Sequence, residues 1–213
     1  MLYFLMGDTT YFQPLTKEDR ITVILYRAGI FLSALIISLC AFIVFKSLQN
    51  NDAQVFPFII SGLNLNILLL ILYFSVGLSV FFIHLYIGKF HRTLKKIYYL
   101  AVVCLAVLFF TGHGNPVMPL LRVPPYGALL LLPLSLCLGF VAAKEAFCFR
   151  LIEGYILAIL MPAYVFFYSV GVLGEKSAAY GFILIAALLV FFTFRKIFMP
   201  VHYDIGDKSA YQL

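Results

Sequence analysis

The chain has 213 residues, of which 64% are hydrophobic and 11% are charged. A water-soluble globular protein carries about 25% charged residues, so a soluble fold is excluded. We attribute the net charge of +6 to Lys and Arg on the cytoplasmic face of a membrane rather than to nucleic-acid binding.

Six long stretches contain no charged residue, and each is at least 18 residues long. A helix of about 20 residues crosses the hydrocarbon core of a bilayer. The sequence therefore predicts an all-α, polytopic membrane protein, a bundle of six transmembrane helices. The stretches are 28–45, 53–88, 97–121, 123–143, 154–174 and 177–194.

The first helix is predicted to begin at Thr16, because Thr-Lys-Glu-Asp resembles a capping box. Its membrane part is expected at 21–45. The second uncharged stretch is too long for one helix and permits two interpretations. It forms either one span at 65–87, after an interfacial or re-entrant approach at 53–64, or two short crossings.

The distribution of Lys and Arg decides between these interpretations. With one crossing, eleven basic residues lie on the cytoplasmic side and three (Lys46, Arg122 and Lys176) outside, whereas two crossings leave four inside and ten outside. The positive-inside rule favours one crossing, with both termini cytoplasmic. The eleven are Lys17, Arg20, Lys89, Arg92, Lys95, Lys96, Lys144, Arg150, Arg195, Lys196 and Lys208.

The remaining spans are expected at 94–111, 126–143, 155–173 and 178–197, and the third is short enough that Lys95 and Lys96 must snorkel. The organisation predicted is a cytoplasmic or interfacial segment at 1–15, a membrane domain at 16–197 and a cytoplasmic tail at 198–213.

Two sequence features predict how the spans pack. Small residues at four-residue spacing allow close helix contact; they are Gly29 with Ser33, Ala34 with Ser38, and Ser75 with Ser79. Pro133 and Pro162 lie inside expected spans and are predicted to kink them.

Several function classes lack their sequence signatures. Acidic residues lie only at the ends of the expected spans, whereas ion-coupled carriers usually hold an ionisable group at mid-membrane. The zinc helix, the phosphate-binding glycine loop with its lysine and the serine-hydrolase elbow are not found. Neither a catalytic set nor a metal-ligating set is therefore predicted.

Arg27 lies in the cytoplasmic half of the first span. An unpaired arginine there is costly, so it must snorkel to the interface or form an ion pair. Glu145 and Glu153 are the expected candidates for its partner, because they follow the fourth span at a similar depth.

His84 and His91 are seven residues apart and are expected on one helix face near the cytoplasmic end of the second span. They permit an interfacial hydrogen-bonding role or, as a low-probability alternative, a haem or chlorophyll ligated by His84. No cofactor is otherwise predicted.

The densest polar patch near a membrane edge runs from Lys144 to Glu153 and includes Cys148. It permits a connector that lies among lipid headgroups or a reactive or acylated thiol. With the residues above, it makes a candidate cytoplasmic-face polar cluster: Arg27, His84, His91, Arg92, Lys144, Glu145, Cys148, Arg150 and Glu153.

Three strings resemble a family of predicted integral membrane proteins of bacteria, prominent in cyanobacteria, with a domain of unknown function. They are Lys17-Glu-Asp-Arg20 with Leu25-Tyr-Arg27-Ala-Gly29, His84-Leu-Tyr86 with His91-Arg92, and Lys144-Glu-Ala-Phe-Cys-Phe149. The last string is the most specific. The resemblance extends over 16–195 and implies a membrane core without an assigned activity.

The function predicted is a non-enzymatic accessory or assembly factor, or a small subunit of a larger membrane complex. The alternatives are a channel or uniporter for a small or apolar solute, using Asn64, Asn66, Tyr164 and Tyr168, and an intramembrane enzyme or a cofactor- or pigment-binding protein. The expected partners are membrane lipids and other membrane proteins or a second copy. The expected location is the inner (plasma) membrane, or a thylakoid if the source is photosynthetic.

Overall fold

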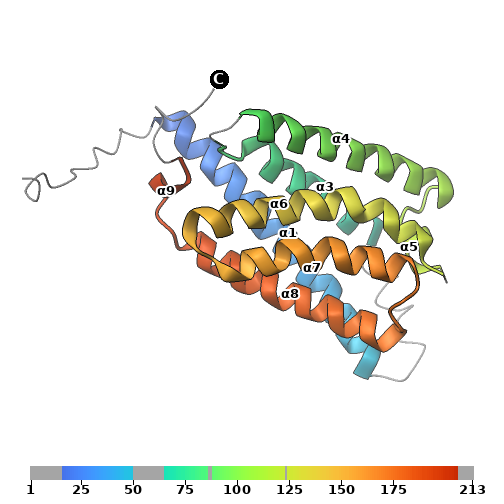
Figure 1. The fold of residues 1–213 in the computed structure, drawn as a ribbon. Helices are drawn as coiled ribbons and strands as arrows, with labels where there is room; N and C mark the ends of the chain where they lie inside the picture. The colour runs from blue at the N-terminus through green and yellow to red at the C-terminus, as the bar shows by residue number, and fades with distance from the viewer. Residues whose placement is uncertain (1–15, 50–64, 86–87, 123, 206–213) are drawn as a thin grey trace, which may run out of the picture.

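The computed structural model describes residues 16–49, 65–85, 88–122 and 124–205, and every regular element in these ranges is helical (Figure 1). The predicted segments 1–15 and 53–64 lie outside these ranges, and the predicted tail at 198–213 lies only partly inside them. The elements are α1 (Lys17–Gln49), α3 (Leu65–Phe82), α4 (Gly88–Thr111), α5 (Met118–Leu121), η1 (Tyr126–Leu131), α6 (Leu132–Phe149), α7 (Ile152–Ser169), α8 (Glu175–Ile197) and α9 (His202–Ile205).

The predicted six-helix membrane fold is confirmed. Six helical segments in the described ranges are long and apolar enough to cross a bilayer, with η1 and α6 together forming the fourth. The stretch 65–87 contributes one such helix, α3. Consecutive spans run in opposite directions, so α1 begins and α8 ends at the same end of the bundle (Figure 1).

The first helix begins where its capping box predicts. The Asp19 backbone N–H donates to Thr16 Oγ1 at 3.2 Å, and the Thr16 backbone N–H donates to Asp19 Oδ2 at 2.8 Å. Two backbone donors that a helix start leaves unpaired are thereby satisfied.

Small residues bring α1 and α3 into close contact, as their spacing predicts. The hydroxyls of Ser33 and Ser75 are 2.8 Å apart and both residues are buried. A Cβ built on Gly29 would lie 2.5 Å from the Ser75 carbonyl oxygen and 2.8 Å from the Ser79 backbone nitrogen. We call Gly29, Ser33, Ser75 and Ser79 the small-residue seam.

One expected feature of the spans is wrong. The α3 helix ends at Phe82 and α4 begins at Gly88, so the third span has 24 residues and is not short. Pro133 lies inside the fourth span, as predicted, at the point where the 3-10 turn η1 ends and α6 begins. It occupies the first turn of α6, where a helix tolerates a missing N–H. Pro162 does lie inside a helix, α7.

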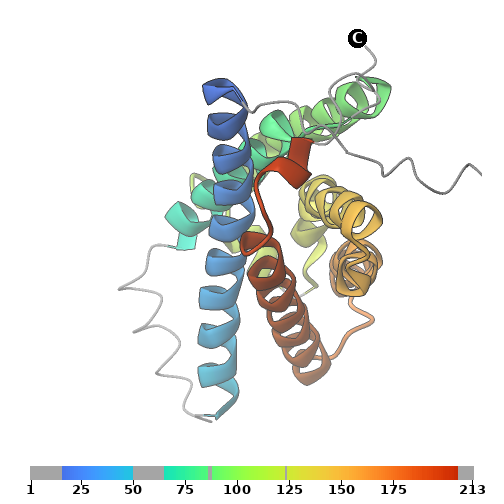
Figure 2. The ribbon, with the colours of Figure 1, turned by 90° about the vertical axis from the view of Figure 1, so that its left-hand side faces the viewer.

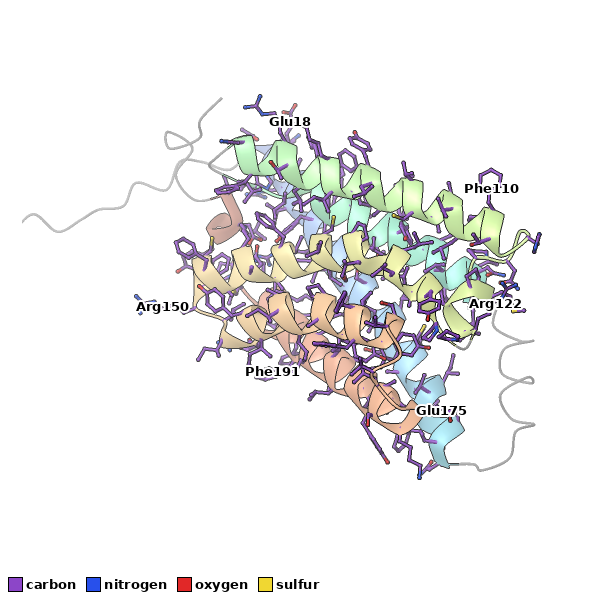
Figure 3. All side chains as sticks on the ribbon, turned by 45° about the vertical axis from the view of Figure 1, so that its right-hand side comes forward. Glu18, Phe110, Arg122, Arg150, Glu175 and Phe191 are labelled. Carbon is purple, nitrogen blue, oxygen red and sulfur yellow. The ribbon has the colours of Figure 1, made fainter. Side chains whose placement is uncertain are left out.

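The helices do not form a simple parallel bundle. Figure 2 shows α6 and α7 nearly end-on, while α1 and α8 run down the view. The α6 helix packs along α7, and α1 packs along both α3 and α8. Figure 3 distinguishes the two ends of the bundle: Glu18 and Arg150 lie at one end, Arg122 and Glu175 at the other.

Candidate functional site

A cluster of buried charges lies at the end of the bundle marked by Glu18 and Arg150. Its members come from four helices, which is why sequence spacing does not reveal it. We call it the ion network; it consists of Tyr26 and Arg27 of α1, Lys144 and Glu145 of α6, Lys196 of α8 and Asp204 of α9.

Glu145 is one of its two carboxylates, and it has no solvent exposure. Its Oε1 accepts hydrogen bonds from the Tyr26 hydroxyl at 2.6 Å and from Lys144 Nζ at 2.7 Å. Its Oε2 forms an ion pair with Lys196, which is also fully buried. Glu145 lies near the C-terminal end of α6, as the sequence predicts, but the fold buries its side chain in the protein interior.

Asp204 is the second carboxylate, and it comes from the segment predicted as a tail. It accepts a hydrogen bond from Arg27 Nε at 2.6 Å and forms a second ion pair with Lys196. Only 4% of the residue is exposed. Asp204 thus joins α9 to both α1 and α8.

Arg27 forms an ion pair, as one of its two sequence interpretations requires, but the expected partners are wrong. Its partner is Asp204 rather than Glu145 or Glu153. The guanidinium also donates to three backbone carbonyls at the end of α8 and just beyond, at distances of 2.6 to 3.2 Å. Those carbonyls belong to Ile197, Met199 and Pro200. Because the last carbonyls of a helix lack partners and carry partial negative charge, Arg27 caps α8.

Glu153 forms a separate ion pair. Arg195 Nη1 lies 2.8 and 2.9 Å from its two carboxylate oxygens, and this contact joins α7 to α8. The Arg195 side chain is 42% exposed, so solvent screens this pair more than the pairs of the ion network.

The ion network contains three cations and two carboxylates, so it carries one excess positive charge when all members are ionised. Polarised groups offset this excess. Lys196 Nζ lies 4.1 Å from the centre of the Phe149 ring, and Lys144 Nζ lies 5.4 Å from that of Tyr26. The backbone carbonyl oxygens that accept hydrogen bonds from Arg27 also offset positive charge. The arrangement fastens helix ends together.

Three further members of the predicted cluster are not part of the ion network. Arg92 and Cys148 are exposed. Arg150 is also exposed and adopts a left-handed backbone conformation, with φ of 54°, where it terminates α6. Part of the polar patch from Lys144 to Glu153 is therefore the C-terminal end of α6.

The two histidines do not share a helix face, because α3 ends before His84 and His91 belongs to α4. His84 Nε2 lies 3.2 Å from Thr22 Oγ1, and His91 Nε2 lies 3.3 Å from the Val80 carbonyl oxygen. The Thr22 hydroxyl already bonds to helix carbonyls, so we assign the proton of this contact to His84 Nε2.

A haem or chlorophyll on His84 would therefore have to use Nδ1, which is buried and has no protein partner. Within the described ranges no group of three or more His, Cys, Asp or Glu side chains is placed to hold a metal ion. Burial, and secondarily the charge of Lys144, lowers the pKa of His84 below its ordinary value of 6.5. The haem or chlorophyll alternative for His84 stays untested.

Sequence reasoning missed Tyr26, Lys196 and Asp204 as members of the site. Lys196 was counted only as a cytoplasmic charge, and Asp204 was assigned to the tail. One sequence signal does exist, since an Asp eight residues after a span-terminal Lys can fold back on it. Nothing in the sequence distinguishes that Asp from an exposed tail residue.

A cavity of about 350 Å³ lies toward the opposite end of the bundle. We call it the chamber. Residues of α1, α3, α5, η1, α6, α7 and α8 line it, together with Val117 just before α5. Tyr164 and Tyr168, which the sequence suggested for a solute path, are among them, whereas the Asn66 side chain accepts a hydrogen bond from the Val117 backbone N–H at 3.3 Å.

Residues 78–213 match a protein family described as "Uncharacterized integral membrane protein (DUF2301)". The chain is also 28% identical over 211 residues to an uncharacterized protein of Haemophilus influenzae, an alignment that covers 98% of this chain and 100% of the relative. No solved structure matches the chain. The predicted family resemblance is confirmed, while its prominence in cyanobacteria stays a prediction.

Proposed function

From the premise that the chain belongs to the DUF2301 family of uncharacterized integral membrane proteins, we propose that it is a non-enzymatic accessory or assembly factor, or a small subunit, of a larger membrane complex. We further propose that both termini face the cytoplasm and that the protein resides in the inner membrane, or in a thylakoid if the source is photosynthetic. The positive-inside rule supports this orientation, because the end of the bundle that carries the ion network is also the end richer in Lys and Arg.

The ion network supports a role without catalysis. Its carboxylates and cations bind one another and the end of α8, so their charges are used to hold helices together. A catalytic group needs access to a substrate, whereas Glu145 and Lys196 have no solvent exposure. A structural role accounts for every contact that these two residues make.

The observation that carries the proposal is the sparse packing of α4. Only 17% of its most apolar window is buried, the lowest share among the six spans. Its buried residues are Leu94, Ala101 and Leu108, which form one narrow stripe at seven-residue spacing. From Ile97 onward the α4 surface carries no charged residue and is largely apolar; it includes Phe110, which is 82% exposed and points away from the bundle in Figure 3.

We test this proposal by site-specific photocrosslinking in native membranes. A photoreactive amino acid at Val103, which is 59% exposed on α4, is expected to give one discrete protein adduct. The matched site is Ile159 on α7, which is 74% exposed and is expected to give lipid adducts only. The same adduct should persist in mild-detergent native electrophoresis. A lone monodisperse monomer without an α4 adduct would contradict the proposal.

The chamber favours a second candidate, a channel or uniporter for a small or apolar solute. Its walls include the Pro162-containing helix α7, along with Tyr164 and Tyr168. A conduction path would have to open past the small-residue seam and the ion network. Flux of apolar and small neutral solutes into reconstituted vesicles tests this alternative, and equal flux in protein-free vesicles would remove it.

A further inference from the structure

The chamber arises from the way α1 and α3 cross. The two helices touch most closely at the small-residue seam, where Gly29 and Ser33 meet Ser75 and Ser79. The chamber is lined by α1 from Ile36 onward and by α3 up to Val76, so it opens on one side of this crossing. Helices that cross at an angle separate on either side of their contact, and the chamber is the part of that space that the side chains do not fill.

The lining is almost entirely hydrocarbon. Ser135 and the two tyrosines bring hydroxyl groups to it, and each hydroxyl already donates to a backbone carbonyl. Ser135 donates to Leu132 at 2.8 Å, Tyr164 to Ala178 at 2.9 Å and Tyr168 to Leu120 at 3.3 Å. The hydroxyl donors of the chamber are thus occupied within the protein, so its occupant needs no acceptor group for them.

Water is a poor occupant for such a space. A buried water makes about three hydrogen bonds, and an apolar cavity without available polar partners stays dry or takes up an apolar molecule. The volume of about 350 Å³ falls at the lower end of the range of roughly 300–1,000 Å³ that is typical of ligand sites. A single flexible hydrocarbon chain fits both the size and the chemistry.

The surroundings identify the source of that chain. The chamber lies within the membrane-spanning helices and is only partly enclosed. Leu120 and Leu121 contribute to its wall, and the next residue, Arg122, is exposed at that end of the bundle (Figure 3). A cation beside an apolar cavity matches a lipid, whose anionic phosphate adjoins its acyl chains.

We propose that the chamber binds one acyl chain of a membrane phospholipid, with the headgroup phosphate at Arg122. The bound chain replaces the packing contacts that the lining side chains lack on the cavity side. The protein is therefore a specific lipid-binding protein in addition to any role in a complex, and the two proposals fail independently.

Retention of lipid by the purified protein tests this inference. We expect native mass spectrometry of wild-type protein, purified from native membranes and washed in mild detergent, to show one phospholipid per chain. Ser135→Phe on α6 and Cys40→Phe on α1 each place a ring in the chamber, and we expect each to lower the retained lipid by about tenfold or more.

Each variant has a matched control one residue away on the lipid-facing surface. Leu136→Phe and Leu39→Phe add a ring at residues that are 42% and 41% exposed, and both should retain lipid like the wild type. Equal retention in all four variants overturns the proposal, as does wild-type protein without bound lipid. An isoprenoid found in place of a phospholipid also overturns it.

A measurement on unaltered protein protects the test from folding defects in the variants. In vesicles of phosphatidylethanolamine and phosphatidylglycerol that contain phosphatidylglycerol with a photoreactive acyl chain, we expect adducts at chamber residues such as Leu138 and Met161. Adducts confined to outward-facing residues such as Leu136 overturn the proposal.

The headgroup position has its own test. Arg122→Gln should weaken retention of phosphatidylglycerol by about two- to fivefold, the effect of losing one exposed charge pair. Arg150→Gln, at the opposite end of the bundle, should leave it unchanged. Equal retention in both variants overturns the placement of the phosphate at Arg122.

Discussion

Glu145 has no contact with solvent, so the cost of burying its charge is offset only by its neighbours. Two lysines and the Tyr26 hydroxyl provide that compensation. Removing one partner of such a set is more damaging than removing a matched pair, because the groups left behind stay buried without compensation.

We predict that Glu145→Gln lowers the free energy of unfolding by about 3–5 kcal/mol, because Lys144 loses the one carboxylate that it pairs with among the described residues and Lys196 loses one of two. Denaturant unfolding in mixed micelles measures the change. Glu175→Gln, at an exposed carboxylate, serves as the control and should stay within about 0.5 kcal/mol. The double variant Glu145→Gln with Lys196→Met should recover part of the loss; no loss in the single variant would show that the network does not stabilise the fold.

The burial of His84 predicts that the free energy of unfolding depends on pH. Because burial lowers its pKa in the folded protein, the unfolded chain, with a pKa near 6.5, binds a proton first as the pH falls. The free energy of unfolding should therefore decline from about pH 6.5 down to the lower folded pKa and then level off. His84→Asn should remove this component, whereas His113→Asn, at an exposed residue, should keep it. Parallel stability curves for wild type and His84→Asn would contradict the prediction.

At the scale of elements, the α1–α3 contact depends on the absence of a side chain at Gly29. Glycine inside a helix is unfavourable by about 1 kcal/mol relative to alanine. At Gly29 the steric clash of an added Cβ outweighs the better helix propensity of alanine. The atoms nearest to that Cβ include the backbone of Ser75 and Ser79, which cannot rotate away.

We predict that Gly29→Ala lowers the free energy of unfolding by about 1–3 kcal/mol despite the better helix propensity of alanine. Gly174→Ala is the matched control, because an added Cβ there meets nothing within 4 Å and its φ of −65° suits alanine. Thermal unfolding of both variants in the same detergent gives the comparison. A Gly29→Ala protein as stable as the wild type would mean that α1 and α3 separate without cost.

At the scale of the whole molecule, the proposed orientation rests on the excess of Lys and Arg at the end of the bundle that carries the ion network. We predict that Cys148, at the network end, reacts with a membrane-impermeant maleimide only after the membrane is permeabilised, in a variant that lacks Cys40, Cys104 and Cys137. Cysteine placed at Arg122 in a cysteine-free background should react in intact cells. The reverse labelling pattern would overturn the proposed topology.

Much of the fold follows from local properties of the chain. The charge-free stretches predict six spans, Thr16 predicts the start of α1, and the small residues predict a close helix contact, because each depends on composition or spacing within one segment. The C-terminal boundary of α3 was harder to predict, since the stretch from Phe82 to Gly88 contains no Asp, Glu, Lys or Arg to mark the end of the helix.

The sequence by itself determined that this is a six-span membrane protein, and it placed Arg27, Lys144 and Glu145 at one end of the bundle. Only the tertiary structure decided that Arg27 binds Asp204, that Lys196 lies between two carboxylates, and that a chamber remains beside the α1–α3 crossing. The physical reason is that hydropathy and charge bias act on each segment separately, whereas ion pairs and cavities depend on how distant helices cross.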